Sequence, residues 1–198
     1  MDYKEEFTDI YKKYIVREGA DKLFEYLIKS DFFTTPASAK YHCSHEGGLC
    51  EHSINVYKRL LAEVKTEYGE MYYNKYSDET IAISGLLHDI CKIDYYAVEQ
   101  RNVKVNGVWE QKPFYAIKEK LPYGHGEKSV YIVGGFIRLT REEAIAINWH
   151  MGGFDDRVKG GNHSVSEAFA KFPLSVLLHV ADLSATYMDE ARSDQDSI

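Results

Sequence analysis

Apolar residues recur at helical spacing along nearly the whole chain, and several of the helix faces that should enter the core also carry a histidine or an aspartate. The apolar stripe of Leu49 and Val56 includes His52, and two other stripes include Asp89 and Asp182. A buried carboxylate is strongly disfavoured unless a cation or a hydrogen-bond network compensates it. We therefore expect a mainly α-helical protein whose core supplies such partners, either from its own lysines and arginines or from a bound metal ion.

The same periodicity places the individual helices. We expect them over residues 2–16, around 23–28, over about 49–68, from 77 or 78 through 93, from 123 to 137, from 140 to 150 and from 173 to about 190. Thr140 with Glu143, and Ser164 with Glu167, have the spacing of capping boxes. Residues 34–48 are predicted to form an ordered loop or a short helical turn, and the glycine-rich residues 151–164 a loop.

Residues 95–116 break the helical pattern. β-favouring residues flank Asn106-Gly107, a pair that accepts the positive φ angles of a tight turn, so the segment predicts a small β-hairpin insertion. No repeat or linker divides the chain, which we interpret as a single domain over 1–198. Residues 1–30 would form a helical scaffold and 36–190 the core that holds the functional site. The tail SDQDSI, residues 193–198, is expected to fray.

Composition narrows the class of protein. With 44% hydrophobic and 28% charged residues in 198, the chain can bury a core. A net charge of −7 argues against long nucleic acid as a partner, since phosphate backbones are bound by clustered positive charge. No run approaches the roughly 18 apolar residues of a membrane helix, and the N-terminus is too acidic for a signal peptide, so we expect a cytoplasmic protein without membrane contact. Its three cysteines form no C-x-x-C pair and are interpreted as packing residues.

The phrase GLLHDICKID places a histidine and an aspartate side by side in a predicted core helix. Neighbours on a helix are offset by about 100°, so His88 and Asp89 would approach one ion from two flanks, or the aspartate would bridge two ions. Lys92 follows one turn later. It is either a solvated surface lysine or a cation that attracts a phosphate oxygen. Imidazoles combined with carboxylates suit zinc, iron, manganese or nickel.

In this respect the sequence resembles the HD-domain metal-dependent phosphohydrolases. The family signature is an upstream histidine, a His-Asp doublet and a later aspartate. Here it corresponds to His52 in GGLCEHSINV, His88 and Asp89 in LLHDICK, and Asp182 in LLHVADLSA. The resemblance spans residues 36–188 and implies an HD-domain-like helical bundle. It also implies that these four residues hold one divalent transition-metal ion.

Some members of the family hold a second ion, and the resemblance extends to that site. His125 in PYGHGEKSV and His150 in INWHMGG occupy the expected places, so Asp89 would bridge one ion to another held by these two histidines. The phrase AKYHCSHEGGLCEHS is similar to the subgroup of HD-domain 3′-to-5′ exoribonucleases, in which a histidine corresponds to His42. That subgroup carries an OB domain before the HD domain. We expect none here, which again argues against a long nucleic-acid substrate.

The resemblance implies a metal-dependent phosphoric ester hydrolase. One or two ions of Mn, Fe, Ni, Co or Zn would activate water toward a phosphomonoester or phosphodiester of a nucleotide-like small molecule. Asp89 and Lys92 would be catalytic, and Lys92, His42, Arg157 and Lys159 would bind substrate. Four aromatic residues of the insertion either stack on a base or are structural: Tyr95, Tyr96, Trp109 and Tyr115. Two alternatives remain open, a di-iron oxygenase of the same fold and a non-catalytic nucleotide-binding regulatory domain. His179 is expected to pack in its helix or to donate a supporting hydrogen bond. His45 is either a substrate contact or a surface group, and no role is assigned to His163.

Overall fold

A computed structural model describes residues 2–190, and the predicted tail 193–198 lies outside this range. The chain is mainly helical with one two-stranded antiparallel sheet, which confirms the predicted fold class at this level. In order, the elements are α1 (Tyr3–Tyr14), α2 (Ala20–Lys29), α3 (Gly48–Tyr68), the 3₁₀ helix η1 (Gly69–Asn74), α4 (Asp78–Leu87), η2 (Ile90–Lys92), β1 (Tyr96–Val105), β2 (Val108–Ile117), α5 (His125–Gly134), α6 (Arg141–Trp149), η3 (Gly152–Phe154), α7 (Asp156–Lys159), α8 (Ser164–Lys171), α9 (Pro173–Ser184) and the π-helical η4 (Ala185–Glu190).

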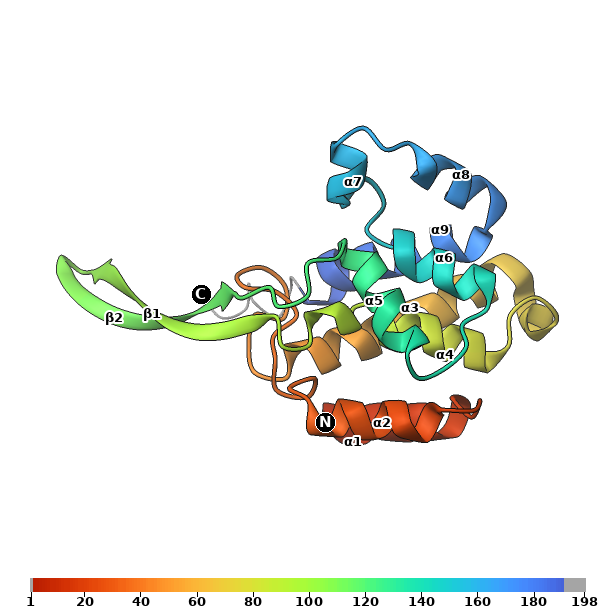
Figure 1. Cartoon of the computed structure of the whole chain (residues 1–198), viewed down its shortest axis with the longest axis horizontal. Helices are drawn as coiled ribbons and strands as arrows, with labels where there is room; N and C mark the ends of the chain where they lie inside the picture. Colours follow the sequence, from red (N-terminus) through yellow and green to blue (C-terminus); the bar gives the residue numbers. More distant parts are fainter. Residues whose placement is uncertain (1, 191–198) are drawn as a thin grey trace.

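Helix α3 is the central element. It packs along α4 and α9, while α6 contacts α5, α4 and α9. The pair α1 and α2 lies along one side of this body, and α7 and α8 lie on the opposite side (Figure 1). The buried stripe of α3 includes Leu49, Val56, Leu60 and Val64, as the periodicity predicts. His52 lies on the same stripe and is buried with them, so the core is built around a polar group.

Two of the predicted helix starts have side-chain caps. The Ser77 hydroxyl accepts the Thr80 N–H at 3.1 Å and caps α4. Thr140 and Glu143 form the predicted capping box of α6, with N–H to oxygen distances of 3.2 and 2.8 Å. The second capping box is wrong. Helix α8 begins at Ser164 itself, and the Asn162 side chain accepts its N–H at 2.8 Å, which leaves no capping position for the Ser164 hydroxyl.

Two other expectations need correction. The helix predicted through residue 93 ends at Leu87, because Asp89 leaves helical geometry with φ −106° and ψ 16°. Because the backbone bends at Asp89, the 100° offset between neighbours on a helix no longer applies. The side chains of His88 and Asp89 therefore both reach the same cluster of polar side chains. The loop predicted over 151–164 contains two single helical turns, η3 and α7. The Asp155 carboxylate initiates α7 by accepting the Arg157 N–H at 2.8 Å.

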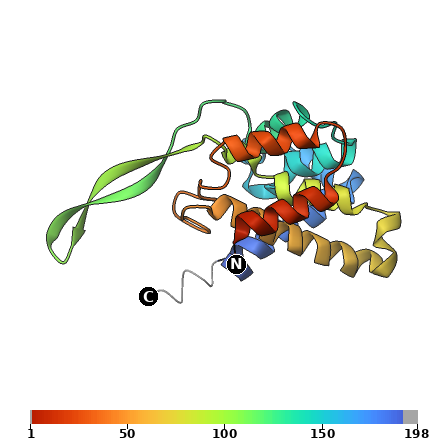
Figure 2. The same ribbon diagram turned by 90° about the horizontal axis from the view of Figure 1, so that it is seen from below.

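The predicted hairpin is present and long. Its strands pair from Tyr96 opposite Ile117 to Val105 opposite Val108. Asn106 and Gly107 form the turn with φ angles of 49° and 86°, as their residue types predict. Both views show the hairpin as a twisted arm that extends away from the helical body (Figures 1 and 2).

Helices α3 and α4 approach each other closely at Gly85. A Cβ atom there would lie 2.6 Å from the Cα of Tyr57, a distance that side chains do not tolerate. Gly85 lies one turn before His88, and Tyr57 lies about one turn after His52. The absence of a side chain therefore lets the two helices bring these histidines together.

An arginine from the corner between α1 and α2 joins the scaffold to the body. Arg17 donates to both carboxylate oxygens of Glu143 on α6, at 2.8 and 3.0 Å, and to Glu79 on α4 at 3.2 Å. Glu143 is fully buried, so its charge depends on this partner. Within residues 2–190, no single helix combines the length and apolar character needed to cross a membrane, although the bent pair Ser164–Lys171 and Pro173–Glu190 meets that test jointly.

Candidate metal centre

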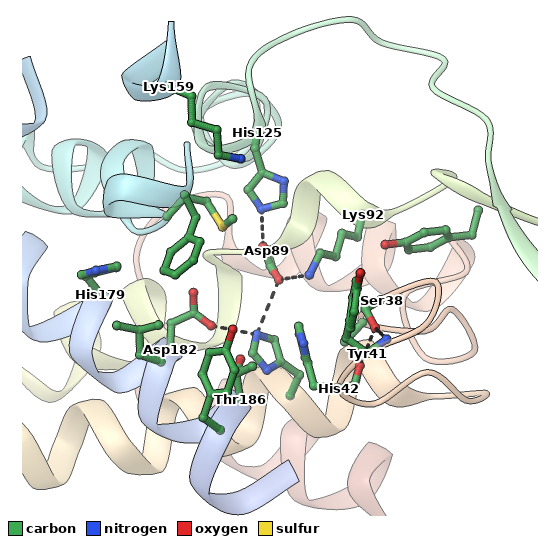
Figure 3. Close-up of a pocket in the computed structure, with 17 residues that line it drawn as sticks. Ser38, Tyr41, His42, Asp89, Lys92, His125, Lys159, His179, Asp182 and Thr186 are labelled. Carbon is green, nitrogen blue, oxygen red and sulfur yellow. Dashed lines mark hydrogen bonds and ion pairs between the residues drawn. The ribbon is translucent and has the colours of Figure 1, made fainter. Parts of the chain in front are cut away.

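The six residues predicted as metal ligands come together at one end of the helical body. They are supplied by five segments: His52 by α3, His88 and Asp89 by the residues after α4, His125 by the start of α5, His150 by the end of α6 and Asp182 by α9. His52, His88, Asp89 and His150 are buried, and Asp182 and His125 border a cavity. Figure 3 shows Asp89 at the centre of the group, between His125 on one side and Asp182 on the other.

The first group surrounds the Nε2 atom of His52. This nitrogen lies 3.3 Å from His88 Nε2, 3.3 Å from Asp182 Oδ1 and 3.5 Å from Asp89 Oδ2. An ion bound at about 2.1 Å holds its neighbouring ligand atoms roughly 3.0 to 3.4 Å apart, depending on whether it is octahedral or tetrahedral. The spacing and the mixed imidazole and carboxylate donors therefore fit a divalent transition metal.

The second group surrounds the other oxygen of Asp89. Its Oδ1 atom lies 2.7 Å from His125 Nε2 and 3.4 Å from His150 Nε2. The His150 Nε2 atom is buried and makes no hydrogen bond to any residue between 2 and 190, while its Nδ1 donates to the Ile147 carbonyl at 2.7 Å. The lone pair of His150 Nε2 therefore points toward the Asp89 oxygen. A cation between these two atoms would bind both of them. A cation there would replace the 2.7 Å hydrogen bond between Asp89 and His125, so the second group also offers donors for a metal, with Asp89 shared between the two.

The imidazoles of His88 and His52 are oriented in the same way. His88 Nδ1 donates to the Gly85 carbonyl at 2.9 Å, which leaves its Nε2 facing the first group. His52 Nδ1 donates to the two carboxylate oxygens of Glu190 at 3.0 and 3.1 Å. Ligand histidines in metalloproteins commonly have their second nitrogen fixed by such a partner. The tautomers and ring orientations in this site are thus set by groups outside it.

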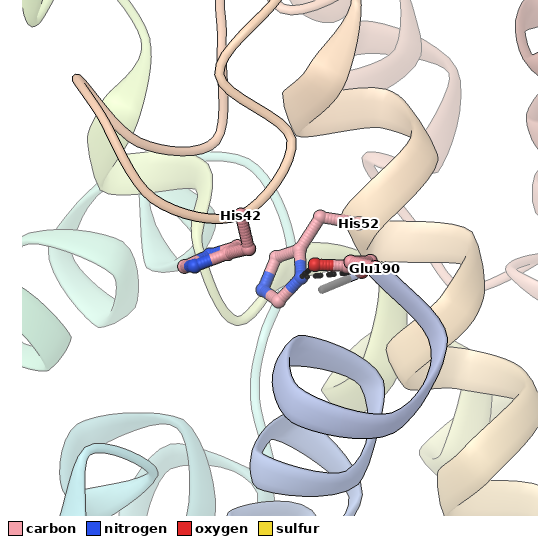
Figure 4. Close-up of side chains that lie close together, drawn as sticks. All are labelled: His42, His52 and Glu190. Carbon is pink, nitrogen blue, oxygen red and sulfur yellow. Dashed lines mark hydrogen bonds and ion pairs between the residues drawn. The ribbon is translucent and has the colours of Figure 1, made fainter. Parts of the chain in front are cut away.

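Glu190 is the functional residue that sequence reasoning missed. It lies on η4, is buried, and also accepts the Asn55 side-chain N–H at 3.1 Å. Figure 4 shows its carboxylate against the His52 ring, with His42 on the other side. Its signal in the sequence is weak: Glu190 follows Asp182 by eight residues, which lies about 80° away around a helix and still within a broad core-facing stripe.

The protonation of the cluster reflects its density of acidic oxygens. Burial opposes charge on His52, but Glu190 and Asp182 outweigh it and raise the pKa of His52 to about 10. Burial likewise opposes charge on His125, yet Cys91 and Asp89 raise its pKa to about 10. Burial lowers the pKa of His88 to about 3. Without a metal, protons on two imidazoles thus supply positive charge that a bound cation would replace.

Lys92 is placed at the same carboxylate. Its Nζ atom donates to Asp89 Oδ2 at 2.5 Å, and the side chain is almost fully buried. Burial opposes the ammonium charge, but the Asp89 carboxylate outweighs it and raises the pKa of Lys92. The interpretation of Lys92 as a solvated surface lysine is therefore wrong. The ammonium faces the cavity beside the ligand cluster.

A cavity of about 640 Å³ opens from the cluster to solvent. Of the residues predicted to bind substrate, Lys92, His42 and Lys159 line this cavity. Arg157 does not line it. Its guanidinium donates to Asp155, Glu127 and Asn148 and lies over the Trp149 ring. The cavity wall is otherwise rich in apolar and aromatic side chains: Ala37, Tyr41, Tyr96, Met151, Phe154, Leu183 and Tyr187.

The other histidines and the hairpin aromatics divide between the cavity and the surface. His179 lines the cavity and donates from Nδ1 to the His150 carbonyl at 2.6 Å, as expected of a supporting residue. His45 and His163 are exposed. Tyr96 also lines the cavity, but Trp109 lies beside the hairpin turn and is 68% exposed. Among the aromatic residues predicted to stack on a base, only Tyr96 borders the main cavity within residues 2–190.

No protein-family model, curated protein or solved structure matches the chain. The assignment of chemistry therefore depends on the geometry. Two overlapping donor groups share Asp89 and adjoin a cavity that contains an ammonium group. Such a site can bind one or two divalent cations and an anionic ligand.

Proposed function

We propose that the protein is a metal-dependent phosphohydrolase of the HD-domain type, which hydrolyses a phosphomonoester or phosphodiester of a nucleotide-like small molecule. The observation that carries the proposal is the position of Asp89. One of its oxygens faces His52 and the other faces His125 and His150, and Lys92 contacts the same carboxylate. The order of these ligands along the chain is the order that the resemblance to HD-domain proteins implies.

The residues present would divide the work as follows. His52, His88, Asp89 and Asp182 would hold one ion, and Asp89, His125 and His150 the other. A bound divalent ion would polarise a phosphoryl oxygen and lower the pKa of water toward neutrality. Lys92 can neutralise a phosphate oxygen that enters the cavity, because its ammonium is already held at the ligand cluster.

His42 is suited to hydrogen bonding rather than to charge neutralisation. Burial, assisted by the positive charges of His52 and Lys92, lowers the pKa of His42 to about 4, so its ring is neutral at neutral pH. Its buried Nε2 atom has no hydrogen-bond partner within residues 2–190. That nitrogen is available to a polar group of a substrate in the cavity.

The shape of the cavity supports a small substrate with an aromatic part. The phosphate would lie at the ligand cluster, and the apolar wall around Tyr41, Phe154 and Tyr187 offers a surface for a base. Lys159 is exposed at the rim, where it donates to Asp156 at 3.0 Å, and can reach a second charged group. A volume of about 640 Å³ suits a mononucleotide-sized ligand.

The test is phosphate release by metal-stripped protein that has been reloaded with manganese, iron, nickel, cobalt or zinc. We expect turnover of at least one nucleotide or phosphodiester. Asp89→Asn should lower the rate by about 100-fold or more and remove both ions, since a lost ligand should weaken the site at least as much as a lost supporting group. His125→Gln and His150→Gln should remove only one ion, as measured by elemental analysis. The exposed His163→Gln serves as the matched control.

Two results would replace the proposal. Consumption of oxygen by the iron-loaded protein, with no phosphate release under anaerobic conditions, would identify an oxygenase. Tight nucleotide binding without any product, with every metal, would identify a regulatory binding domain. Full metal content in Asp89→Asn would show that the ions use other ligands.

A further inference from the structure

The hairpin is the largest feature of the molecule that the proposed function does not use. Its ten paired positions extend from the cavity wall at Tyr96 to the turn at Asn106 and Gly107. The two strands contact each other but pack extensively on no helix of the described chain. Figures 1 and 2 show the arm standing clear of the body in both views. An isolated two-stranded hairpin is marginally stable in water, so an arm of this length requires a covering surface.

One face of the arm has the composition of a buried surface. Directly paired residues point to the same side of an antiparallel ribbon and alternate along it. We define the aromatic face by the paired positions Tyr96, Val98, Gln100, Asn102, Lys104, Trp109, Gln111, Pro113, Tyr115 and Ile117. It holds a single charge, on Lys104. The opposite face holds four charged residues, Glu99, Arg101, Glu110 and Lys112, and its six apolar residues are smaller except for Phe114. The two faces thus differ in charge and in aromatic content, since only the first carries a tryptophan and two tyrosines.

The aromatic face is nevertheless open to solvent. Trp109 is 68% exposed, Val98 64% and Ile117 59%. Exposed apolar patches of this kind mark interaction sites, and tryptophan is enriched among the anchors of protein interfaces.

The distribution of charge along the chain indicates which partner covers the aromatic face. The hairpin residues 96–117 contain three lysines and arginines and two glutamates, and so carry +1, whereas the remainder of the chain carries −8. The single charge on the aromatic face, Lys104, is positive. The arm is thus basic relative to an acidic body of the same protein. It cannot reach its own body while it projects from it, but it can reach the body of a second copy.

The area of the arm favours a reciprocal arrangement. Ten residues of strand span about 33 Å and two paired strands about 10 Å, so one face offers roughly 330 Å². Two arms packed only on each other would bury about 650 Å², below the roughly 1,200 Å² of stable interfaces. Two arms that each pack on the partner's body would bury about 1,300 Å², which reaches that range. We propose that the chain forms a two-fold dimer in which each hairpin lays its aromatic face on the body of the other copy.

The experiment is sedimentation velocity of the full chain over a wide concentration range. We expect a dimer that weakens as salt rises, because the contact joins opposite charges. Trp109→Ser combined with Val98→Ser should raise the dissociation constant by about thirtyfold or more. Tyr73→Ser is the matched control, since Tyr73 is 56% exposed on η1, at the end of the body away from the hairpin. Helical circular dichroism and metal content should be equal in all three proteins, because none of these side chains enters the core or the donor cluster.

Hydrogen exchange provides a second measurement that does not depend on the variants. In the dimer, the amides of β1 and β2 should exchange more slowly as protein concentration rises. A wild-type chain that is monomeric at every concentration would overturn the proposal. So would a dimer that the double substitution leaves intact, or strand protection that is independent of concentration. Each of these outcomes leaves the proposed hydrolase activity untouched, so the two proposals fail separately.

Discussion

Glu190 shows how much of the candidate metal centre depends on a residue that would contact no metal. Its buried carboxylate accepts the Nδ1–H of His52 and the side-chain N–H of Asn55. Burial opposes its ionisation, yet His52 and the hydrogen bonds lower the pKa of Glu190 to about 2. The carboxylate is therefore charged at neutral pH and directs the His52 Nε2 atom toward the donor group.

Replacing Glu190 by glutamine should weaken metal binding about 10- to 100-fold, the usual effect of losing such a supporting partner. The amide keeps the shape of the carboxylate but loses its charge and its full capacity to accept. Calorimetric titration of the metal-free protein measures the change. Asp189→Asn on the same turn is the control, because Asp189 pairs with Arg59 at the surface and should leave affinity unchanged. Equal affinities in the two variants would contradict the role of Glu190.

The histidines also predict how the stability of the metal-free protein varies with pH. The pKa values of His52 and His125 are raised from 6.5 to about 10, so their stabilisation is complete below about pH 6.5 and is lost as pH rises toward 10. The pKa values of His88 and His42 are lowered to about 3 and about 4, so these residues destabilise the fold as pH falls below 6.5.

Urea unfolding of the chelator-treated protein should therefore show a maximum of stability near pH 6.5 and a decline on both sides. The metal-loaded protein should lose the alkaline part of the decline, because the cation replaces the protons on His52 and His125. Identical alkaline profiles for the two forms would show that metal and protons do not compete at these residues.

At the level of elements, Arg17 fixes the α1–α2 pair to α4 and α6. Arg17→Met should lower the free energy of unfolding by about 3–5 kcal/mol, because it leaves the buried Glu143 carboxylate without its cation. Arg59→Met should change it by less than about 1 kcal/mol, since the Arg59 ion pair with Asp189 is partly exposed. Chemical denaturation of both variants makes the comparison, and similar losses would contradict the structural role of Arg17.

The elements that the sequence predicted correctly are those that local chemistry determines. Ser77 and Thr140 cap helices through atoms three residues away, and Asn106-Gly107 turns a hairpin through its own φ angles. The errors lie where the backbone departs from the expected helix path. Nothing in the local pattern ends α4 at Leu87, and the Ser164 spacing fits a cap that the backbone path through Asn162 pre-empts.

The same distinction applies to the site. The six ligand residues could be named because their types are anomalous on apolar helix faces and because their order resembles a known family. The separation between Glu190 and His52 is 138 residues, and only the path of the chain brings them together. The sequence also did not reveal that Arg157 pairs with Asp155 and Glu127. A loop with lysine and arginine resembles a phosphate-binding loop until its acidic neighbours in space are known.

For the whole molecule, the donor groups tie together helices from about two-thirds of the chain, from α3 to α9. A ligand that binds only the folded state stabilises all of it. At a free metal concentration about 1,000-fold above the dissociation constant, we expect about 4 kcal/mol of added stability, which corresponds to a rise of roughly 8–16 °C in Tm. Differential scanning calorimetry with and without metal measures the shift, and His163→Gln should show the same rise. No shift with any of the five metals would argue against the centre.

The closeness of α3 and α4 at Gly85 has a consequence for how such a protein could change over generations. Any heavier residue there would wedge the two helices apart at Tyr57, and the displacement would be carried one turn along α4 to His88. A substitution remote from the cavity wall could thus silence the centre while every ligand stayed in place. The six donors alone are therefore not enough to indicate function in descendants of this chain. Glycine at position 85 is needed as well.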